Sequence, residues 1–451
     1  MKQYESYKES GIEWLGKIPS HWKIISFKRL FSFGRGLSIT KADLVEEGIP
    51  VISYGQIHSK QNTGTRIEQH LLRYVPESYT EGYESSKVNS GDFIFADTSE
   101  DLEGCGNCVY IDNDYLLYAG YHSIIAKSIQ SNDNKYLAYL FKTDSWRSQI
   151  RSSVFGVKVF SITQSTLGDS TVILPPVDEQ MRIASYLDYK VGQIDGAIKE
   201  KEAMLEDLKA YRTAIISEAV TKGLDKNVEM KDSGVEWIGM IPKHWGICKL
   251  KALADVQTGN TPSTSVDKYW ENPTEEWYTP SDFDDFEIQL KSSSRKLSTV
   301  AFKEEACRVF YANTVLIVGI GATLGKVGIS TKVCSANQQI NAISFREEVL
   351  PLFGAYYLFS IKDAMKAVAN AATLAIMNQS LTKDLPFVLP PFKEQTRIVE
   401  AIDNKTSKIT CCITNLQSQI ADLKSYKSSV ISEAVTGKVD LREWKCKTAN
   451  V

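Results

Sequence analysis

The chain has 451 residues, of which 43% are hydrophobic and 24% are charged, and its formal net charge is −3. This length is more than one hydrophobic core normally serves, so it predicts two or three globular domains. No apolar run reaches the roughly 18 residues that a transmembrane helix needs, and the acidic balance excludes a protein held on DNA by bulk positive charge alone.

The N-terminal segment, residues 1–19, begins a sequence that returns later in the chain. ESGIEWLGKIPSHW starts at Glu9, and DSGVEWIGMIPKHW starts at Asp232, 223 residues further on. His21 and His244 hold matching places in the two copies. The five histidines lack the spacing of metal ligands, so we expect a structural role for this pair. The first residues also lack the apolar core of a signal peptide, which predicts a cytoplasmic protein.

Residues 20–173 predict a compact α+β domain. A β-type run at 92–95 and a short helical stretch at 136–141 are separated by glycine-rich and polar turns. Cys105 and Cys108 form a C-x-x-C without a second pair that would complete a zinc site, so we interpret them as part of a glycine-rich turn. The domain carries two more acidic than basic residues.

Residues 174–222 predict a long helix. LPPVDEQMRIASYLD starts at Leu174, and paired prolines of this kind end a strand and suit the first turn of a helix. The sequence recurs as LPPFKEQTRIVEAID from Leu389, a shift of 215 residues. The same shift aligns DLKAYRTAIISEAVT from Asp207 with DLKSYKSSVISEAVT from Asp422, without a gap. The chain therefore contains two copies of one sequence unit.

The second half follows the same plan. A linker at 223–243 repeats the N-terminal segment, and a second α+β domain is expected at 244–388, with a strand at 314–318 and a helix at 353–359. A second long helix is expected at 389–440, followed by a tail at 441–451. This second domain carries one more acidic than basic residue. The two domain sequences diverge strongly although the flanking repeats do not, which suits two readers of different targets.

Both helices carry apolar residues in alternating steps of four and three, the pattern of a coiled coil. Lys201, Arg212 and Lys427 interrupt the pattern, and Gly223 and Gly437 are expected to end the helices. Mutual pairing is the favoured arrangement, and packing of each helix on its own domain is the alternative. The predicted pairing residues are Leu187, Val191, Ile194, Ile198, Leu205, Leu208 and Ile215 in the first helix, and Ile402, Ile409, Ile413, Leu416, Ile420, Leu423 and Val430 in the second.

Motifs of catalysis are missing or incomplete. The glycine cluster at 319–327 fails the phosphate-loop pattern, because Val327 stands where Ser or Thr would bind magnesium. The tetrapeptide N-P-P-[YF] of amino-methyltransferases does not occur, and the acidic run at 282–287 lacks the lysine of a nuclease site. The sequence therefore predicts no enzyme and no metal site.

The order of domain, LPP-x-x-EQ-x-RI helix, domain and second such helix resembles the specificity subunit of type I DNA restriction–modification systems. The resemblance covers essentially the whole chain. It implies two α+β target-recognition domains joined by two long conserved helices that form an antiparallel coiled coil, with an internal pseudo-twofold repeat. It also implies that each domain reads one half of a bipartite, asymmetric sequence in double-stranded DNA, and that the helices set the unread spacer.

The resemblance further implies partners and an absence of catalysis in this chain. Two methyltransferase (modification) subunits, which methylate adenine, and restriction or translocase subunits would assemble with it, away from any membrane. S-adenosylmethionine, ATP and Mg²⁺ would belong to those partners, and no cofactor is expected in this chain. A two-headed protein-interaction scaffold is the alternative function.

Candidate DNA-reading residues are polar side chains in predicted loops, because Arg, Lys, Asn and Gln are the usual readers of base edges. Asn337, Gln338 and Gln339 form the sharpest cluster, with a turn inside the domain as the alternative interpretation. The full set is Arg35, Lys41, Tyr54, Gln56, His58, Lys60, His122 and Lys158 in the first domain, and Thr261, Ser263, Lys268, Tyr278, Ser281, Asp282, Thr323, Lys326, Asn337, Gln338, Gln339 and Asn378 in the second.

Overall fold

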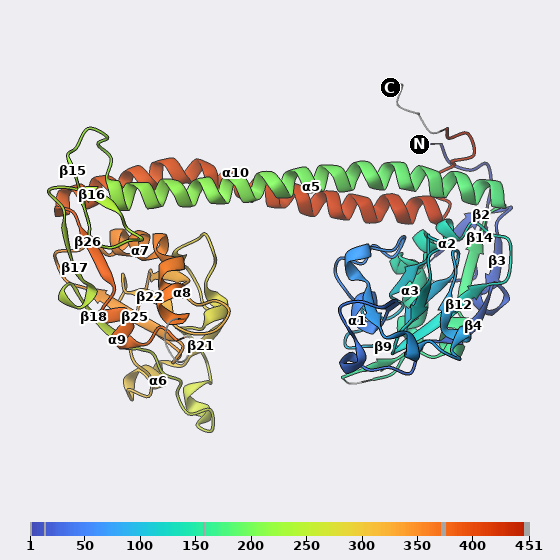
Figure 1. Cartoon of the computed structure of the whole chain (residues 1–451), viewed down its shortest axis with the longest axis horizontal. Coiled ribbons are helices and arrows are strands. Elements are labelled where there is room, and N and C mark those ends of the chain that lie inside the picture. The colour runs from blue at the N-terminus through green and yellow to red at the C-terminus, as the bar shows by residue number, and fades with distance from the viewer. Residues whose placement is uncertain (1, 13–14, 157, 371–375, 446–451) are drawn as a thin grey trace. The chain divides into compact units, whose positions relative to one another are not determined.

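The chain folds into two compact units, each a mixture of helices and sheets. The computed structural model describes residues 2–12, 15–156, 158–370 and 376–445, so the predicted tail lies outside the described residues from 446 onward. Unit 1 comprises Met1–Glu200 with Gln419–Val451, and unit 2 comprises Lys201–Ser418 (Figure 1). The predicted α+β fold class is confirmed.

Unit 1 is built on two four-stranded sheets, with strand orders β10-β8-β12-β4 and β6-β5-β11-β7. Strand β8 contains only apolar residues, all buried, because it is central in its sheet. The strands are β1 (Tyr7–Glu9), β2 (Lys17–Pro19), β3 (Lys23–Ser26), β4 (Phe31–Arg35), β5 (Ile49–Ile52), β6 (Arg73–Val75), β7 (Lys87–Val88), β8 (Phe93–Ala96), β9 (Thr98–Ser99), β10 (Cys108–Tyr110), β11 (Leu117–Ala119), β12 (Ser123–Ser128), β13 (Phe160–Ser161) and β14 (Thr171–Leu174).

Short helices cover the first of these sheets. They are α1 (Tyr54–Ile57), α2 (Asn134–Phe141), α3 (Asp144–Ser153) and α4 (Gln164–Gly168). Helix α2 is capped by Asp133, whose carboxylate accepts from the backbone N–H of Tyr136. Its Phe141 packs on Trp146 of α3, with ring centroids 4.5 Å apart, and on Phe93 of the sheet at 5.1 Å. This aromatic core holds the helices on the sheet.

Unit 2 repeats this plan with a five-stranded sheet, β18-β25-β22-β23-β20, and a three-stranded one, β21-β19-β24. The strands are β15 (Met230–Asp232), β16 (Met240–Pro242), β17 (Gly246–Lys249), β18 (Ala254–Thr258), β19 (Glu275–Tyr278), β20 (Gln289–Leu290), β21 (Arg295–Leu297), β22 (Val315–Val318), β23 (Val327–Ser330), β24 (Cys334–Ala336), β25 (Ile340–Phe345) and β26 (Pro386–Leu389). The short helices are α6 (Thr299–Lys303), α7 (Pro351–Ser360), α8 (Lys362–Asn370) and α9 (Gln379–Lys383). The strands and helices predicted at 92–95, 136–141, 314–318 and 353–359 are confirmed within one or two residues.

Two long helices follow the proline pairs. Helix α5 spans Val177–Lys222 and helix α10 spans Phe392–Val435. Each is followed by a glycine with positive φ, Gly223 at 76° and Gly437 at 74°, which are the predicted terminators. Helix α10 thus ends five residues before the predicted limit of 440, because the chain turns at Gly437.

Within each unit the two helices pack against each other and against the domain. In unit 1, Ile183 and Leu187 of α5 share one apolar core with Val430 and Ile431 of α10. Further along the same pair, Lys427 of α10 contacts Asp195 of α5 at 2.6 Å, so the helices are antiparallel there. In unit 2, the end of α5 packs on the start of α10, through Ile216, Ala219, Val220, Ile398, Val399 and Ile402. Both packing arrangements considered from the sequence therefore occur together.

The predicted pairing residues differ in how deeply they are buried. The buried ones are Leu187, Ile194, Ile198, Leu205, Ile402, Ile413, Leu416, Ile420 and Val430, and the half-buried ones are Val191, Leu208, Ile215, Ile409 and Leu423.

No helix of the described residues is long and apolar enough to cross a membrane.

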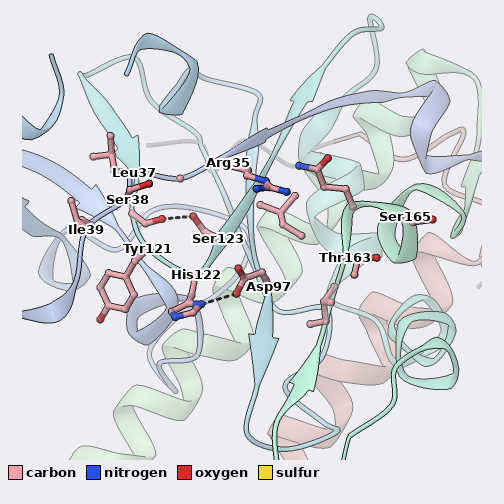
Figure 2. A pocket seen from close by; sticks show the side chains of 15 residues that line it. Arg35, Leu37, Ser38, Ile39, Asp97, Tyr121, His122, Ser123, Thr163 and Ser165 are labelled. Carbon is pink, nitrogen blue, oxygen red and sulfur yellow. Dashed lines mark hydrogen bonds and ion pairs between the residues drawn. The ribbon is translucent and has the colours of Figure 1, made fainter. Parts of the chain in front are cut away.

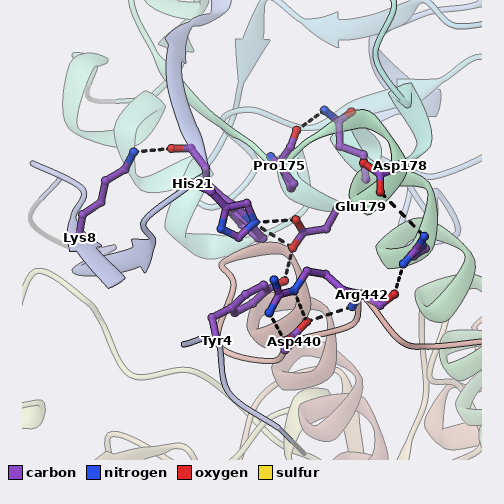
Figure 3. Close-up of polar contacts among 11 residues, drawn as sticks. Tyr4, Lys8, His21, Pro175, Asp178, Glu179, Asp440 and Arg442 are labelled. Carbon is purple, nitrogen blue, oxygen red and sulfur yellow. Dashed lines mark hydrogen bonds and ion pairs between the residues drawn. The ribbon is translucent and has the colours of Figure 1, made fainter. Parts of the chain in front are cut away.

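A buried carboxylate joins the N-terminal repeat to the start of α5. Glu179 accepts from the hydroxyl of Tyr4 and from the indole N–H of Trp22, and its other oxygen lies 2.8 Å from Nε2 of His21 (Figure 3). In unit 2, Glu394 contacts Nε2 of His244 at 2.9 Å. The structural role predicted for the two histidines is confirmed.

Candidate nucleic-acid interface

Unit 1 contains an open cleft of about 670 Å³ at one edge of its sheets. Four segments meet there: residues 35–39 at the end of β4 and just after it, Asp97 after β8, residues 120–124 in the β11–β12 turn and the start of β12, and residues 162–165 at the start of α4 (Figure 2). These segments are far apart in the sequence, and only the sheet brings them together.

Two glycines allow the walls of the cleft to approach each other. A Cβ on Gly36 would lie 1.8 Å from the carbonyl oxygen of Gly120, and a Cβ on Gly120 would lie 1.9 Å from Oγ of Ser53. A side chain on Gly36 would therefore have to displace backbone, and one on Gly120 would have to displace the side chain of Ser53. Ser123 closes the same turn by donating to the carbonyl of Gly120 at 2.6 Å.

His122 and Asp97 form a polar pair inside the cleft. His122 has φ of 52°, in the left-handed region that few residues other than glycine adopt. Its Nδ1 lies 3.2 Å from Oδ1 of Asp97, and the backbone N–H of Asp97 donates to the carbonyl of His122 (Figure 2). The backbone carbonyl of Asp97 also accepts from the N–H of Ile162, so both backbone groups of Asp97 are hydrogen-bonded and its position is fixed.

Arg35 is the cation of this cleft. It ends strand β4 opposite Ile124 of β12, and its carbonyl accepts from Oγ of Ser86 at 2.8 Å. Its side chain is exposed, and its guanidinium has no hydrogen-bond or ionic partner within the described part of the chain. The backbone is therefore fixed while the charged group is free.

The other predicted readers of unit 1 are divided between free and internally bonded side chains. Lys41, Lys60 and Lys158 are exposed. The amide oxygen of Gln56 accepts from the N–H of Ser53, and His58 contacts the carbonyl of Thr98 at 2.9 Å and the amide of Asn107 at 3.1 Å. These two side chains bond inside the domain, and neither lines the cleft.

Tyr54 contacts both His58 and the cleft residue His122. Its ring lies 4.7 Å from the ring of His58 and 6.3 Å from that of His122, measured between centroids. Partial burial, and then the negative charges of Glu100 and Asp101, raise the pKa of Tyr54. The hydroxyl therefore stays neutral in the physiological range.

Unit 2 presents different side chains at the same positions of the same scaffold. Thr258 lies opposite Asn341 in the β18–β25 pair, as Arg35 lies opposite Ile124. In the neighbouring strand pair, Val318 lies opposite Ile340 in unit 2, as Ala96 lies opposite Ser123 in unit 1. The residue after Val318 therefore matches the residue after Ala96, so Gly319 stands where Asp97 stands. In the same way the residue before Ile340 matches the residue before Ser123, so Gln339 stands where His122 stands. Gln379 begins α9 as Gln164 begins α4.

A closed set of neutral hydrogen bonds fills this region of unit 2. Thr258 donates to Oδ1 of Asn341 at 2.7 Å, and Gln379 donates to the hydroxyl of Thr258 at 3.0 Å. Asn341 is buried and donates to the carbonyl of Met377 at 2.7 Å and to the hydroxyl of Thr382 at 3.1 Å. The two units thus combine one scaffold with two different surfaces.

Some of the predicted readers of unit 2 lie at this edge. Asn337, Gln338 and Gln339 form the turn between β24 and β25, where Gln338 is exposed and accepts from the hydroxyl of Thr261 at 2.6 Å. Asn337 is buried and donates to Gln339, so the turn interpretation holds for its side chain. Asn378 caps α9 by accepting from the N–H of Leu381 at 2.9 Å.

The remaining predicted residues of unit 2 make contacts inside the domain. Tyr278 is buried and donates to the carbonyl of Leu290, so its side chain faces the core instead of the solvent, and burial raises its pKa. Lys326 contacts Asp285 at 3.0 Å and donates to the carbonyl of Phe283. The other contacts are Lys268 with Glu304, Ser263 with Ser265, Ser281 with Thr279, Asp282 with the N–H groups of Thr279 and Ser294, and the carbonyl of Thr323 with the N–H of Lys326.

Several residues of the cleft were not predicted, notably Asp97, Thr163 and Gln164. For Thr163 and Gln164 a signal exists, because the 215-residue shift that aligns the long helices also aligns them with Asn378 and Gln379. For Asp97 the sequence offers no such signal, since its partner position in the repeat is Gly319. Among the described residues, no group of three or more His, Cys, Asp or Glu side chains could hold a metal ion.

Comparisons with known proteins agree with this organisation. The family model "Type I restriction modification DNA specificity domain" matches residues 19–206 and 242–421. The chain is 22% identical over 449 residues to the putative type I restriction enzyme MjaX specificity subunit of Methanocaldococcus jannaschii, covering 97% of each chain. It is 23% identical to the EcoBI specificity subunit of Escherichia coli, covering 98% of this chain and 91% of that one.

A solved structure shares the fold. It comes from work on the "complex assembly and conformational transition of the type I R-M system", with a TM-score of 0.67, 16% identity, and coverage of 94% of this chain and 99% of that one. The two matches of the family model account for well over half of the sequence. The chain therefore belongs to the type I restriction modification DNA specificity family, and it carries two copies of the family's domain.

Proposed function

We propose that this chain is the non-catalytic recognition subunit of a type I restriction–modification complex, and that each unit reads one half of a bipartite, asymmetric DNA site. The observation that carries the proposal is the pair of matched edges. One strand register presents Arg35, Asp97 and His122 in unit 1, and Thr258, Gly319 and Gln339 in unit 2. Two readers that share a scaffold and differ in side chains suit two different half-sites.

The charge of the chain supports a reader that works with partners. Nonspecific DNA binding relies on many phosphate contacts from Lys and Arg, and a chain with net charge −3 supplies few of them in excess. We expect two methyltransferase subunits to add phosphate contacts and to carry S-adenosylmethionine, and restriction subunits to use ATP and Mg²⁺. The work of this chain is then to choose the sequence and to assemble the complex.

The test maps methylated adenines at single-molecule resolution in cells that express the chain with its methyltransferase partner. The expected result is one bipartite motif that disappears when the chain is deleted. A chimera in which residues 20–173 come from a relative should change one half of the motif and leave the other half intact. Methylation that lacks a bipartite motif, or a chimera that changes both halves, would contradict the proposal.

A second experiment tests the absence of catalysis in this chain. The purified chain, incubated alone with plasmid, Mg²⁺ and S-adenosylmethionine, is expected neither to cleave nor to methylate DNA. Activity that follows the chain through purification and is lost in a variant of the chain would overturn that part of the proposal.

A further inference from the structure

Arg35 and Asp97 are the two charged groups that line the cleft of unit 1 and still have capacity to bind a ligand. The guanidinium of Arg35 has no partner among the residues that the structure describes and carries five N–H donors, and the backbone of Arg35 is held by β12 and by the hydroxyl of Ser86. Asp97 uses Oδ1 for His122, and its side chain remains 34% exposed. An exposed carboxylate with one oxygen engaged still accepts further hydrogen bonds.

Most other polar side chains of the cleft are already engaged. Thr163 accepts from the N–H of Thr166 as the cap of α4, and Gln164 lies within 3.5 Å of the carbonyl of Gly34. Ser165 donates to Asp169, and Ser123 donates to Gly120. The groups that the cleft offers to a ligand are therefore mainly the guanidinium of Arg35 and the carboxylate of Asp97.

This combination fits the edge of a base pair better than a phosphate. A phosphate would be attracted by Arg35 but repelled by Asp97, which lines the same cleft. In the major groove a G·C pair presents the acceptors O6 and N7 on guanine beside the N4 donor on cytosine. Arg pairs bidentately with the first, and Asp accepts from the second.

We infer that the cleft of unit 1 reads a G·C base pair, with Arg35 donating to O6 and N7 of guanine and Asp97 accepting from N4 of cytosine. His122 is a positioning residue, because its Nδ1 holds Oδ1 of Asp97. The inference rests on the proposed function and adds the base class read by one unit. Thr258 and Gly319, which replace Arg35 and Asp97 in unit 2, carry neither charge, so the same pair is not read there in this way.

The test uses the assembled complex of the full chain and its methyltransferase subunits on duplexes that carry its mapped motif. The half-site of unit 1, identified with the domain chimera, should contain a G·C pair that the complex requires. Replacing that guanine by 7-deazaguanine removes the N7 acceptor. The methylation rate at subsaturating complex is expected to fall roughly 10-fold or more for the native chain, and to change little for Arg35→Ala, which has already lost the contact.

Matched variants separate base reading from charge and from folding. Arg29→Ala removes the same charge just before the other end of β4, where the side chain is exposed and outside the cleft, and should keep the native discrimination. Arg35→Lys keeps the charge and most of the stem but loses the planar fork, so it should bind DNA and lose part of the discrimination at that guanine. Thermal unfolding of each complex verifies that the variants are folded.

The outcomes are distinct. A unit 1 half-site without a G·C pair, or Arg35→Ala and Arg35→Lys variants with native discrimination, overturns the inference and leaves the proposed function intact. Uniform weakening of Arg35→Ala on all sequences, with a smaller salt dependence, assigns Arg35 to a phosphate and also overturns it. A native complex that methylates without any bipartite motif instead contradicts the proposed function itself.

Discussion

Glu179 and Glu394 occupy matching places in the LPP-x-x-EQ repeat, yet their surroundings differ. In unit 1 the side chain of Glu179 is 3% exposed and receives contacts from Tyr4, His21 and Trp22 (Figure 3). In unit 2 the side chain of Glu394 is 24% exposed and contacts His244. The same motif therefore gives a buried carboxylate with three contacts in one unit and a partly exposed Glu–His contact in the other.

The difference comes from what covers each carboxylate. In unit 1 the N-terminal segment supplies Tyr4, and the segment after α10 holds it, with the N–H of Asp440 donating to the carbonyl of Lys2 and Arg442 lying 5.3 Å over the ring of Tyr4. In unit 2 the 223-residue shift places Asn227 where Tyr4 stands. The indole N–H of Trp245, the match of Trp22, has no partner in the described chain. The repeated motif thus gives the same local fold in both units, and the segments that contact the carboxylate determine how deeply that carboxylate is buried.

The largest predicted effect comes from removing these carboxylates one at a time. Glu179→Ala leaves buried donors on Tyr4 and Trp22 without an acceptor and should cost about 3 kcal/mol of stability in unit 1. Glu394→Ala removes one partly exposed contact and should cost about 1 kcal/mol in unit 2. Hydrogen exchange measured by mass spectrometry on peptides of each unit gives the two values separately.

The control for this pair is Glu179→Gln, which keeps an oxygen acceptor and the side-chain shape and should recover part of the loss. Equal protection losses for Glu179→Ala and Glu394→Ala would contradict the view that the covering segment decides the energy of the site.

High pH should weaken unit 1 through Tyr4. Burial, followed by its hydrogen bond to Glu179 and the charge of that carboxylate, raises the pKa of Tyr4 above its ordinary value of 10.0. Because the pKa of Tyr4 is higher in the folded state, its contribution to the free energy of unfolding is fully present below pH 10. This contribution is lost as the pH rises, because the unfolded chain releases the tyrosine proton first. The loss should reach about 1.4 kcal/mol near pH 11.

Tyr4→Phe tests this directly, since it cannot ionise. Tyr136 and Tyr139 of unit 1 also have raised pKa values, mainly through burial, so the Tyr4→Phe variant will still lose some stability at high pH. The measurement is the difference between the native chain and Tyr4→Phe in unit 1 protection from pH 8 to pH 11. A difference that does not shrink with pH would show that Tyr4 ionises as easily when folded as when unfolded.

A third comparison concerns the polar breaks in the two long helices. Lys427 contacts Asp195 at 2.6 Å in unit 1. The 215-residue shift matches this pair with Arg212 and Thr410 in unit 2, where Arg212 is 5% exposed and its Nε and Nη1 have no hydrogen-bond partner in the described structure. Thr410→Asp should supply the missing acceptor and stabilise unit 2 by about 1 kcal/mol.

The matched control is Thr414→Asp, which adds the same charge one turn further along α10 at an exposed position. It should leave the melting temperature of the full chain nearly unchanged, whereas Thr410→Asp should raise it by a few degrees. If both variants behave alike, general charge and not the unpartnered Nε and Nη1 of Arg212 accounts for the effect.

The sequence was informative where structure is local and periodic. The proline pairs, the steps of four and three from Leu187 onward, and Gly223 and Gly437 located both long helices. The cleft could not be predicted in the same way. Its walls come from β4, the end of β8, the β11–β12 turn and α4, and nothing in a single chain states which strands become neighbours. Loop polarity alone therefore selected Tyr278, which the sheet turns inward, and passed over Asp97.

The smallest predicted effect separates capping from base reading at a residue expected to read DNA. Asn378 caps α9 as Thr163 caps α4, so Asn378→Ala should cost about 0.5–1 kcal/mol, and Asn378→Ser should restore most of it because serine is an equally good cap. Asparagine pairs bidentately with adenine and serine does not. If Asn378 only caps the helix, Asn378→Ser restores the native methylation motif together with stability. If Asn378 also reads a base, Asn378→Ser restores stability but methylation still tolerates other bases in the unit 2 half of the motif, which assigns both roles to one side chain.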